Sequence, residues 1–155
     1  MATVKQIVGA ASTMAGSTTA LNSLASGGFS SGVGTLTFAT NDPVDAFLQV
    51  QLVAGSVSGN RQAIIYGKAS LDGTLFESGP GNGGVGTTTT EGNLTLIGVL
   101  PLPEAGTHVG MFSVAPAFSG SMPHSLQPIV KNDSGAAFSS AGNFVMIAEI
   151  SVDVS

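Results

Sequence analysis

The sequence predicts an all-β protein: a single antiparallel β-sandwich or jelly roll preceded by an N-terminal arm rich in Ala, Ser, Thr and Gly. Apolar and polar residues alternate with a period of two in at least five segments after residue 33, which is the period of a half-buried strand. Turn sequences separate these segments, and no convincing helical pattern follows residue 33. Seven or eight short strands joined by turns are typical of a sandwich or jelly roll. We therefore expect residues 1–32 to form the arm and residues 33–155 to form one β-sandwich domain.

The arm holds at most one short helix, from Ser17 to Ala25. Thr18 or Thr19 could cap its first turn, and Gly27 stands where such a helix would end. The alternative is an extended segment that stays unstructured until a partner binds it.

The larger apolar residues of the arm are few, and they are Ile7, Val8, Met14, Leu21 and Leu24. A segment of this kind can dock in a groove, so we expect it to anchor the protein to its neighbours without stabilising its own domain. The alternative is that Leu21 and Leu24 cover one open end of the sandwich.

The predicted strands of the domain span residues 46–53, 62–69, 94–100, 109–114, 126–131 and 144–154. In the first strand Leu48, Val50 and Leu52 share one face, and Gln49 and Gln51 share the other. This pattern predicts a strand with one side in the core.

Turn residues punctuate these strands. Asp72-Gly73 is the strongest hairpin signal in the chain, and it is predicted to join Tyr66–Leu71 to Thr74–Glu77. Pro128 has no N–H donor, which favours an edge or a bulge for its strand.

The last strand shows the clearest alternation in the chain. Asn143, Glu149, Ser151 and Asp153 mark its polar face. The opposite face is predicted to line the core, and it consists of Phe144, Met146, Ala148, Ile150, Val152 and Val154.

Charged residues are rare. Only 8% of the residues are Asp, Glu, Lys or Arg, against about 25% in typical globular proteins. The net charge is −5, and the four basic residues are Lys5, Arg61, Lys68 and Lys131. Four scattered cations cannot form the basic face that nucleic acid or an anionic membrane needs. A surface of small, weakly polar side chains suits permanent contact with other protein, which favours a component of an assembly.

The sequence indicates neither a disulfide-bonded, nor a secreted, nor a membrane-spanning protein. There is no cysteine, so disulfides and thiolate chemistry do not contribute. The first six residues do not have the pattern of a signal peptide. The longest apolar stretch, Leu96 to Leu102, is far shorter than the ~20 residues that span a bilayer. We expect a soluble protein that is made in a cytoplasm.

No catalytic constellation is evident, and we predict a protein that is not an enzyme and has no catalytic, cofactor-binding or metal-binding residues. His108 and His124 both stand beside loop residues, without an acidic neighbour at close spacing. No pair of carboxylates is singled out for glycoside cleavage. The acidic residues are Asp42, Asp45, Asp72, Glu77, Glu91, Glu104, Asp133, Glu149 and Asp153.

Two local patterns resemble binding motifs and are interpreted as loops. Residues 81–86 match G-x-G-x-x-G, but the β-branched residues 87–90 that follow are poor helix formers, and a helix is what a dinucleotide site requires. Residues 41–45 supply one amide and two carboxylates, which is too few for a calcium loop, so a turn is predicted there.

Two segments resemble elements of the small β-sandwich virion structural proteins of tailed bacteriophages. Residues 69–79, ASLDGTLFESG, are similar to a strand–turn–strand element of these proteins. Residues 129–137, IVKNDSGAA, with the Ser- and Gly-rich residues 138–143 and the final strand, are similar to their closing hairpin. The order of elements is similar from residue 33 to residue 155. The resemblance implies a subunit that decorates or cements a capsid, often as a trimer, and it supplies no catalytic residues and no cofactor.

We therefore expect a non-enzymatic virion structural protein, a capsid decoration or cement protein of a bacteriophage head that is assembled in the host cytoplasm. Its partners would be the major capsid protein or other virion subunits, and it would form a homo-oligomer, with a trimer favoured. A tail or head–tail component is the alternative within this class. A carbohydrate- or receptor-binding module is the alternative from another class, and its loop aromatics would be Phe29, Phe118 and Phe138.

Overall fold

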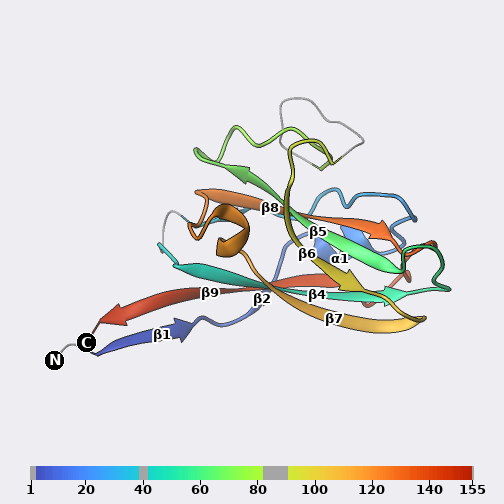
Figure 1. The fold of residues 1–155 in the computed structure, drawn as a ribbon, viewed down its shortest axis with the longest axis horizontal. Coiled ribbons are helices and arrows are strands. Elements are labelled where there is room, and N and C mark those ends of the chain that lie inside the picture. The colour runs from blue at the N-terminus through green and yellow to red at the C-terminus, as the bar shows by residue number, and fades with distance from the viewer. Residues whose placement is uncertain (1–2, 39–41, 82–90, 155) are drawn as a thin grey trace.

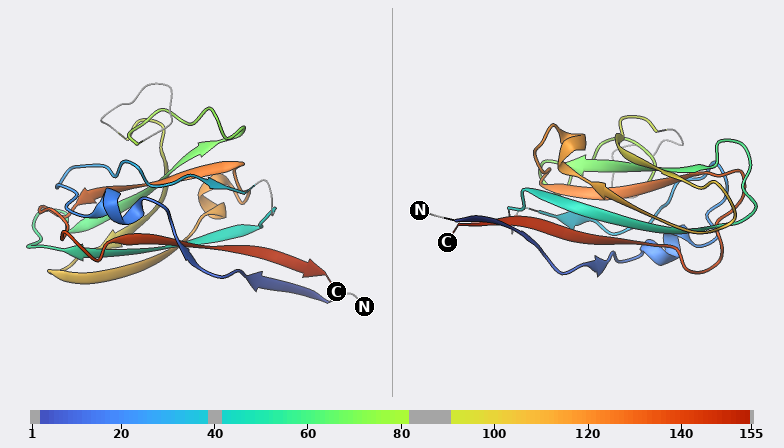
Figure 2. Two further views of the ribbon diagram at one scale, coloured as in Figure 1. Left: turned by 180° about the vertical axis from the view of Figure 1, so that it is seen from behind. Right: turned by 60° about the horizontal axis from the view of Figure 1, so that its bottom comes forward.

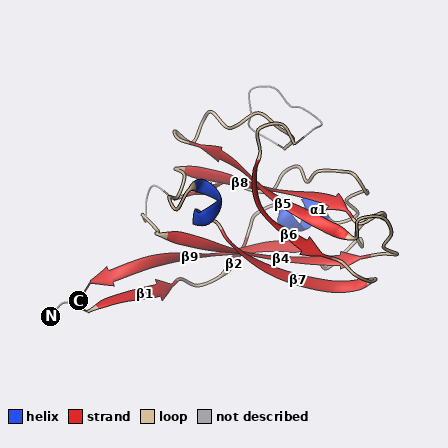
Figure 3. Ribbon diagram, in the orientation of Figure 1, coloured by secondary structure: helices blue, strands red, loops and turns tan. Residues whose placement is uncertain are grey.

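The computed structural model describes residues 3–38, 42–81 and 91–154 and confirms the predicted all-β class (Figures 1 and 3). Two antiparallel sheets lie face to face, with the apolar core between them. One sheet has the strand order β1-β9-β4-β7, with the short β2 also paired to β9, and the other has the order β3-β8-β5-β6. Within the described ranges, no helix is long and apolar enough to cross a membrane.

The six predicted strands that span residues 46–53, 62–69, 94–100, 109–114, 126–131 and 144–154 each have a counterpart in one of the two sheets. The five-stranded sheet contains β1 (Val4–Val8), β2 (Ser12–Thr13), β4 (Asp45–Ala54), β7 (Gly106–Ser113) and β9 (Phe144–Val154). The four-stranded sheet contains β3 (Leu36–Thr37), β5 (Gln62–Ser70), β6 (Thr95–Pro101) and β8 (Ser125–Asp133). The helices of the described residues are α1 (Ser17–Leu21) and the 3-10 helix η1 (Ala115–Phe118), and both are short.

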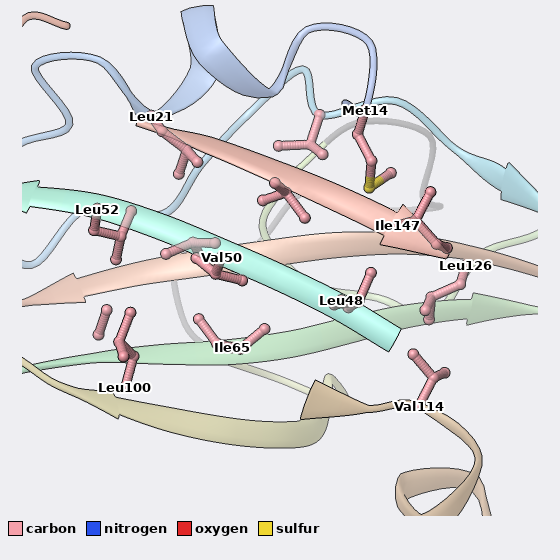
Figure 4. Close-up of a cluster of buried hydrophobic side chains, with 14 of the residues drawn as sticks. Met14, Leu21, Leu48, Val50, Leu52, Ile65, Leu100, Val114, Leu126 and Ile147 are labelled. Carbon is pink, nitrogen blue, oxygen red and sulfur yellow. The ribbon is translucent and has the colours of Figure 1, made fainter. Parts of the chain in front are cut away.

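The facing of β4 agrees with its sequence pattern. Leu48, Val50 and Leu52 are fully buried in the core (Figure 4), while Gln49 and Gln51 are half-buried on the other side of the sheet. The two faces of the five-stranded sheet are therefore set by the alternation in this central strand.

The predicted facing of β9 is wrong for its first half. Val145 and Ile147 lie in the core, opposite Val50 and Leu48 of β4. Residues directly opposite each other in a sheet point to the same face. Phe144, Met146 and Ala148 consequently lie on the outer face, where they are half-buried.

The second half of β9 is also not core. Ile150 is buried, but it lies outside the main core cluster. Val152 and Val154 are exposed. The predicted core face of this strand therefore contributes only Ile150 to the buried residues, and it does so away from the main cluster.

The segment expected to be an arm is built into the sandwich. Met14 and Leu21 are buried in the main core cluster (Figure 4). The backbone N–H of Met14 donates to the carbonyl of Val145 at 2.8 Å, and that of Ser30 donates to the carbonyl of Val130 at 2.8 Å. These contacts contradict the expectation that residues 1–32 do not stabilise their own domain. They favour the alternative in which Leu21 and Leu24 pack on the sandwich, since Leu24 is also partly buried against the same cluster.

The short helix in this segment is smaller than predicted. It ends at Leu21 rather than at Ala25, and its N-cap is Gly16, with no side-chain cap. Thr18 and Thr19 lie inside the helix, so they do not cap it.

A slot for one aromatic ring lies between β6 and β7. A Cβ at Gly98 would stand 2.3 Å from the ring of Phe112, and a Cβ at Gly110 would stand 2.9 Å from the same ring. Because real Cβ atoms do not approach other atoms this closely, the two glycines are what allows the ring to lie against both strands. Phe112 is opposite Leu48, so the ring lies on the core side of the sheet.

Pro128 is not on an edge strand, because β8 lies between β3 and β5. The N–H and C=O of Val130 both hydrogen-bond to Ser30, on the side of β8 that carries β3. Alternate residues of a strand direct these groups to the same side, so the N–H that Pro128 lacks would also point there. The short β3 pairs only with Ser125 and Leu126, so no ladder hydrogen bond to β3 is lost at Pro128.

The Asp72-Gly73 turn is present, but the second strand of the predicted hairpin is reduced to one bridge, Ser70 to Phe76. One oxygen of the Asp72 carboxylate accepts the N–H groups of Thr74 and Leu75, at 2.8 Å each. Gly73 has φ +74°, which suits glycine. The side chain of Asp72 thus occupies two backbone donors within the turn.

Candidate interaction surfaces

A two-stranded ribbon extends beyond the sandwich (Figures 1 and 2). It consists of β1 and residues Ile150–Val154 of β9, and we call it the ribbon. Val8 pairs with Ile150 at its base and Val4 pairs with Val154 at its tip. All five residues of β1 are exposed. A two-stranded ribbon is marginally stable in water by itself, and the outer edge of β1 can pair with another strand, so the ribbon is suited to binding a partner.

The apolar content of the ribbon is high for an exposed element. Its exposed large apolar residues are Val4, Ile7, Val8, Val152 and Val154, with exposed fractions of 42–66%. Its charged residues are Lys5 and Asp153, which are opposite each other in the ladder. An apolar ribbon with balanced charge is more typical of a contact between proteins than of a solvated edge.

A groove of about 820 Å³ lies between the turn after β5 and the segment around η1. Phe76, Phe118 and Met122 supply much of its apolar lining, and the carboxylates of Asp72 and Glu77 stand at its wall. Its volume is in the range of small-molecule sites. The two carboxylates are engaged within the fold, since Asp72 holds its turn and Glu77 accepts the N–H of Ala69 at 3.0 Å.

A smaller hollow of about 470 Å³ adjoins this groove, and it shares the segment 121–123 with it. Phe38, Pro43 and His124 line it. The Nδ1 of His124 is 2.9 Å from the hydroxyl oxygen of Ser125. Asp42 also lines this hollow.

Asp45 ties the start of β4 to η1. Its carboxylate accepts the N–H groups of Ala46 at 2.7 Å, Ala115 at 2.8 Å and Val114 at 3.1 Å, and it also accepts the hydroxyl of Ser113. Burial disfavours the charged form, but the hydrogen bonds outweigh it and hold the pKa of Asp45 below its ordinary value. The carboxylate is therefore a structural anchor, and its donors leave it poorly placed to act as a base.

The outer face of the four-stranded sheet is covered by the chain itself. Lys68 is fully buried there, and its Nζ donates to the carbonyls of Gly79 at 3.3 Å and Gly81 at 3.5 Å. Burial lowers the pKa of Lys68. Gln127, opposite Lys68 in the ladder, is also buried and donates to the carbonyl of Val33 at 3.0 Å. The segments around residues 33 and 79–81 thus close this face.

Lys131 binds two further segments of the chain to the outer face of the four-stranded sheet. Its Nζ forms an ion pair with Glu91, and it lies 5.4 Å from the centre of the Phe29 ring. The hydrogen bond between the two charged groups raises the pKa of Lys131 and lowers that of Glu91. Burial raises the pKa of the neighbouring Tyr66.

The residues considered for chemistry in the sequence are not brought together. His108 lies on β7 rather than in a loop, and its Nε2 is 2.9 Å from the carbonyl oxygen of Glu104. Among the described residues, no three His, Asp or Glu side chains cluster as metal ligands would. Of the G-x-G-x-x-G match only Gly81 is described, and Asn41 of the predicted turn also lies outside the described residues.

The three loop aromatics have different environments. Phe138 is buried in the core cluster, and Phe29 packs beneath Lys131. Phe118 is half-buried and lines the larger groove. Only Phe118 is therefore placed where a ligand in that groove could touch it.

Comparisons with known proteins do not assign the chain to a family. No family model matches the chain, and no curated protein matches it either. Among solved structures, the chain aligns with the Drosophila NLP core, whose structure was described for its pentamer formation and histone binding. That alignment has 11% identity, covers 99% of this chain and 98% of the other, and has a TM-score of 0.26. A similarity this low supports no conclusion about fold or function.

Proposed function

We propose that the chain is a non-enzymatic structural protein that works as one subunit of a larger protein particle. The observation that carries this proposal is the ribbon, which leaves five large apolar residues exposed and has a free strand edge. Isolated soluble domains usually protect such an edge, because it can pair with any other chain. In a subunit of a particle, a neighbouring subunit covers it.

The low charge of the chain supports the same role. Charged residues make up 8% of the sequence, so desolvating a large surface removes few charges from water. In a lattice, many equivalent contacts act at high effective concentration, which offsets the entropy lost when an exposed ribbon is fixed.

The setting that we propose is the head of a bacteriophage, with the chain as a capsid decoration or cement protein bound to the major capsid protein. The support is the resemblance of residues 69–79 and 129–137 to small virion proteins, together with the β-sandwich fold. A tail or head–tail position is the alternative in the same particle, and the virion is the proposed location in both cases.

The experiment adds purified protein to phage heads assembled without it and measures bound protein by sedimentation. The ribbon variant is Val4→Glu with Val154→Glu, which places two charges on paired, exposed positions. We expect binding to fall at least tenfold. The matched control is Leu71→Glu with Leu75→Glu, because these two residues are at least about as exposed (90% and 62%, against 66% and 64% for Val4 and Val154) but lie at the groove. Thermal unfolding of both variants should resemble that of the unmodified protein.

Two results would overturn the proposal. One is that the unmodified protein binds neither phage heads nor phage tails. The other is a ribbon variant that binds heads as tightly as the control does.

The second candidate function is a carbohydrate- or receptor-binding module, and the groove lined by Phe76 and Phe118 is the observation that favours it. Binding of the unmodified protein to an immobilised glycan panel, lost in Phe118→Ala, would support it.

A further inference from the structure

The two outer faces of the sandwich differ in how much of each is covered by other segments of the chain. The four-stranded sheet is covered by segments of its own chain, which bury Lys68 and Gln127. The five-stranded sheet forms the lowest layer in Figure 1, and no described element lies beneath it. On this uncovered face, Val109 and Met111 of β7 are 53% and 63% exposed.

The uncovered face is largely apolar across three adjacent strands. The register aligns its side chains in rows, in which Gln49 lies between Met111 and Met146, and Gln51 lies between Val109 and Phe144. We call the group formed by Phe47, Gln49, Gln51, Val109, Met111, Phe144, Met146 and Ala148 the outer face. None of these residues is charged.

We propose that a second copy of this chain covers the outer face, so that two sandwiches pack sheet against sheet about a two-fold axis. The inference rests on the proposed role as an assembly subunit, and it names the partner of one surface. Identical faces can pack on themselves in this way, and sheets stacked face to face cross at about 30°.

The size of this side of the sheet fits a weak, reversible pair. The ten residues of β4 give a length of about 33 Å, and the three strands β9, β4 and β7, about 4.8 Å apart, give a width of roughly 14 Å. This side of the sheet therefore covers roughly 470 Å² in projection, before side-chain relief is added, which is at the small end of protein interfaces and is typical of association that dissociates on dilution. Most of that area would come from apolar side chains.

The charge distribution favours the same face for self-association. The chain carries a net charge of −5, so two copies repel each other unless they meet where acidic groups are few. Asp45 lies on β4 at the border of this face, and its carboxylate is engaged by hydrogen bonds within its own chain. Asp72, Glu77 and Glu91 belong to the opposite side of the sandwich or to its loops.

The polar centre of the face is also self-complementary. The primary amide of Gln49 both donates and accepts, so two copies can hydrogen-bond to each other across a two-fold axis. Met111 and Met146 flank it on either side, and methionine side chains adapt to irregular surfaces.

The test measures the mass of the purified full chain by light scattering across a concentration series. We expect a dimer that dissociates on dilution. Val109→Glu with Met111→Glu should weaken the association at least tenfold, because four like charges would meet in one interface. Leu71→Glu with Leu75→Glu should change it less than twofold. Thermal unfolding checks that each variant is folded.

A cross-linking measurement keeps the test informative if a charged variant does not fold. The sequence has no cysteine, so Gln49→Cys introduces a single thiol near the proposed axis. We expect it to form disulfide-linked dimers on mild oxidation, while Thr74→Cys, in an exposed turn, should not. A monomer at about 100 µM, a trimer that the Val109/Met111 variant leaves intact, or equal cross-linking at both positions would overturn the proposal. None of these results depends on phage heads, so head binding remains a separate test of the proposed function.

Discussion

The side-chain amide of Asn132 donates a hydrogen bond of 2.7 Å to the backbone carbonyl of Leu24, although the two residues are 108 positions apart. The same amide donates to the carbonyl of Ala136 at 2.8 Å, and its oxygen accepts the N–H of Ser134 at 3.0 Å. Asn132 is fully buried. One side chain thus joins the N-terminal segment to the turn after β8.

Asn132→Leu should lower the free energy of unfolding by about 3 kcal/mol or more, because several buried backbone groups would lose their partner at about 1–3 kcal/mol each. Asn60→Ala is the control. It removes one exposed hydrogen bond to Asp133 and should cost less than about 1 kcal/mol. Urea denaturation measures both, and equal losses would contradict the role assigned to Asn132.

Leu21→Ala should destabilise the domain by about 2–5 kcal/mol, since Leu21 is fully buried in the main cluster and truncation would leave a cavity. Thr19→Ala, at an exposed position of the same helix, should change stability by no more than about 0.5 kcal/mol. Thermal unfolding separates the two. If Leu21→Ala melted with the unmodified protein, the segment would be an independent arm after all.

Ile147→Asp should prevent soluble folding, because it would bury an unpaired charge between the sheets. Ala148→Asp points to the outer face and should remain folded, with a cost of about 1 kcal/mol or less. The measurement is the soluble yield together with circular dichroism. The reverse order of tolerance would restore the facing predicted from the sequence.

Acid should weaken the fold partly through Asp45. Its pKa is lowered in the folded state, so its contribution is present above the ordinary carboxyl pKa and is lost as the pH falls through the lower, folded value. The stability of the unmodified protein should therefore drop more between pH 5 and pH 2 than that of Asp45→Asn, whose side chain does not titrate. Denaturant melts across this range provide the check, and parallel curves would show that Asp45 does not contribute.

The sequence predicts the strands well where polar and apolar residues contrast, as in β4, where Gln49 and Gln51 alternate with buried residues. It fails for the facing of β9. Residues 144–148 are all apolar, so the sequence does not distinguish the two faces of this part of the strand. The facing is indicated only by Asn143 before it and by Glu149, Ser151 and Asp153 after it. Those later residues belong largely to the ribbon, where neither face is covered.

The N-terminal segment could not be predicted for a different reason. It joins the sandwich through backbone hydrogen bonds and buried side chains such as Ser30 and Asn132, and these leave no periodic pattern in the sequence. The low charge does indicate extensive contact with other protein. It does not distinguish the ribbon from the outer face, because both surfaces are rich in apolar residues and neither has a sequence pattern that identifies a contact.

The position of β9 has a consequence for how the protein reaches its native state. β9 lies between β1 and β4, so the first and the last described strands become neighbours, with Val4 opposite Val154. Nearly the whole chain must close as a loop before that pairing forms, which slows folding. During synthesis β4 emerges from the ribosome well before its neighbour β9, and until then one of its edges has no partner. We therefore expect the five-stranded sheet to be completed only after β9 has left the ribosome, and the nascent chain to depend on chaperones until then to avoid aggregation.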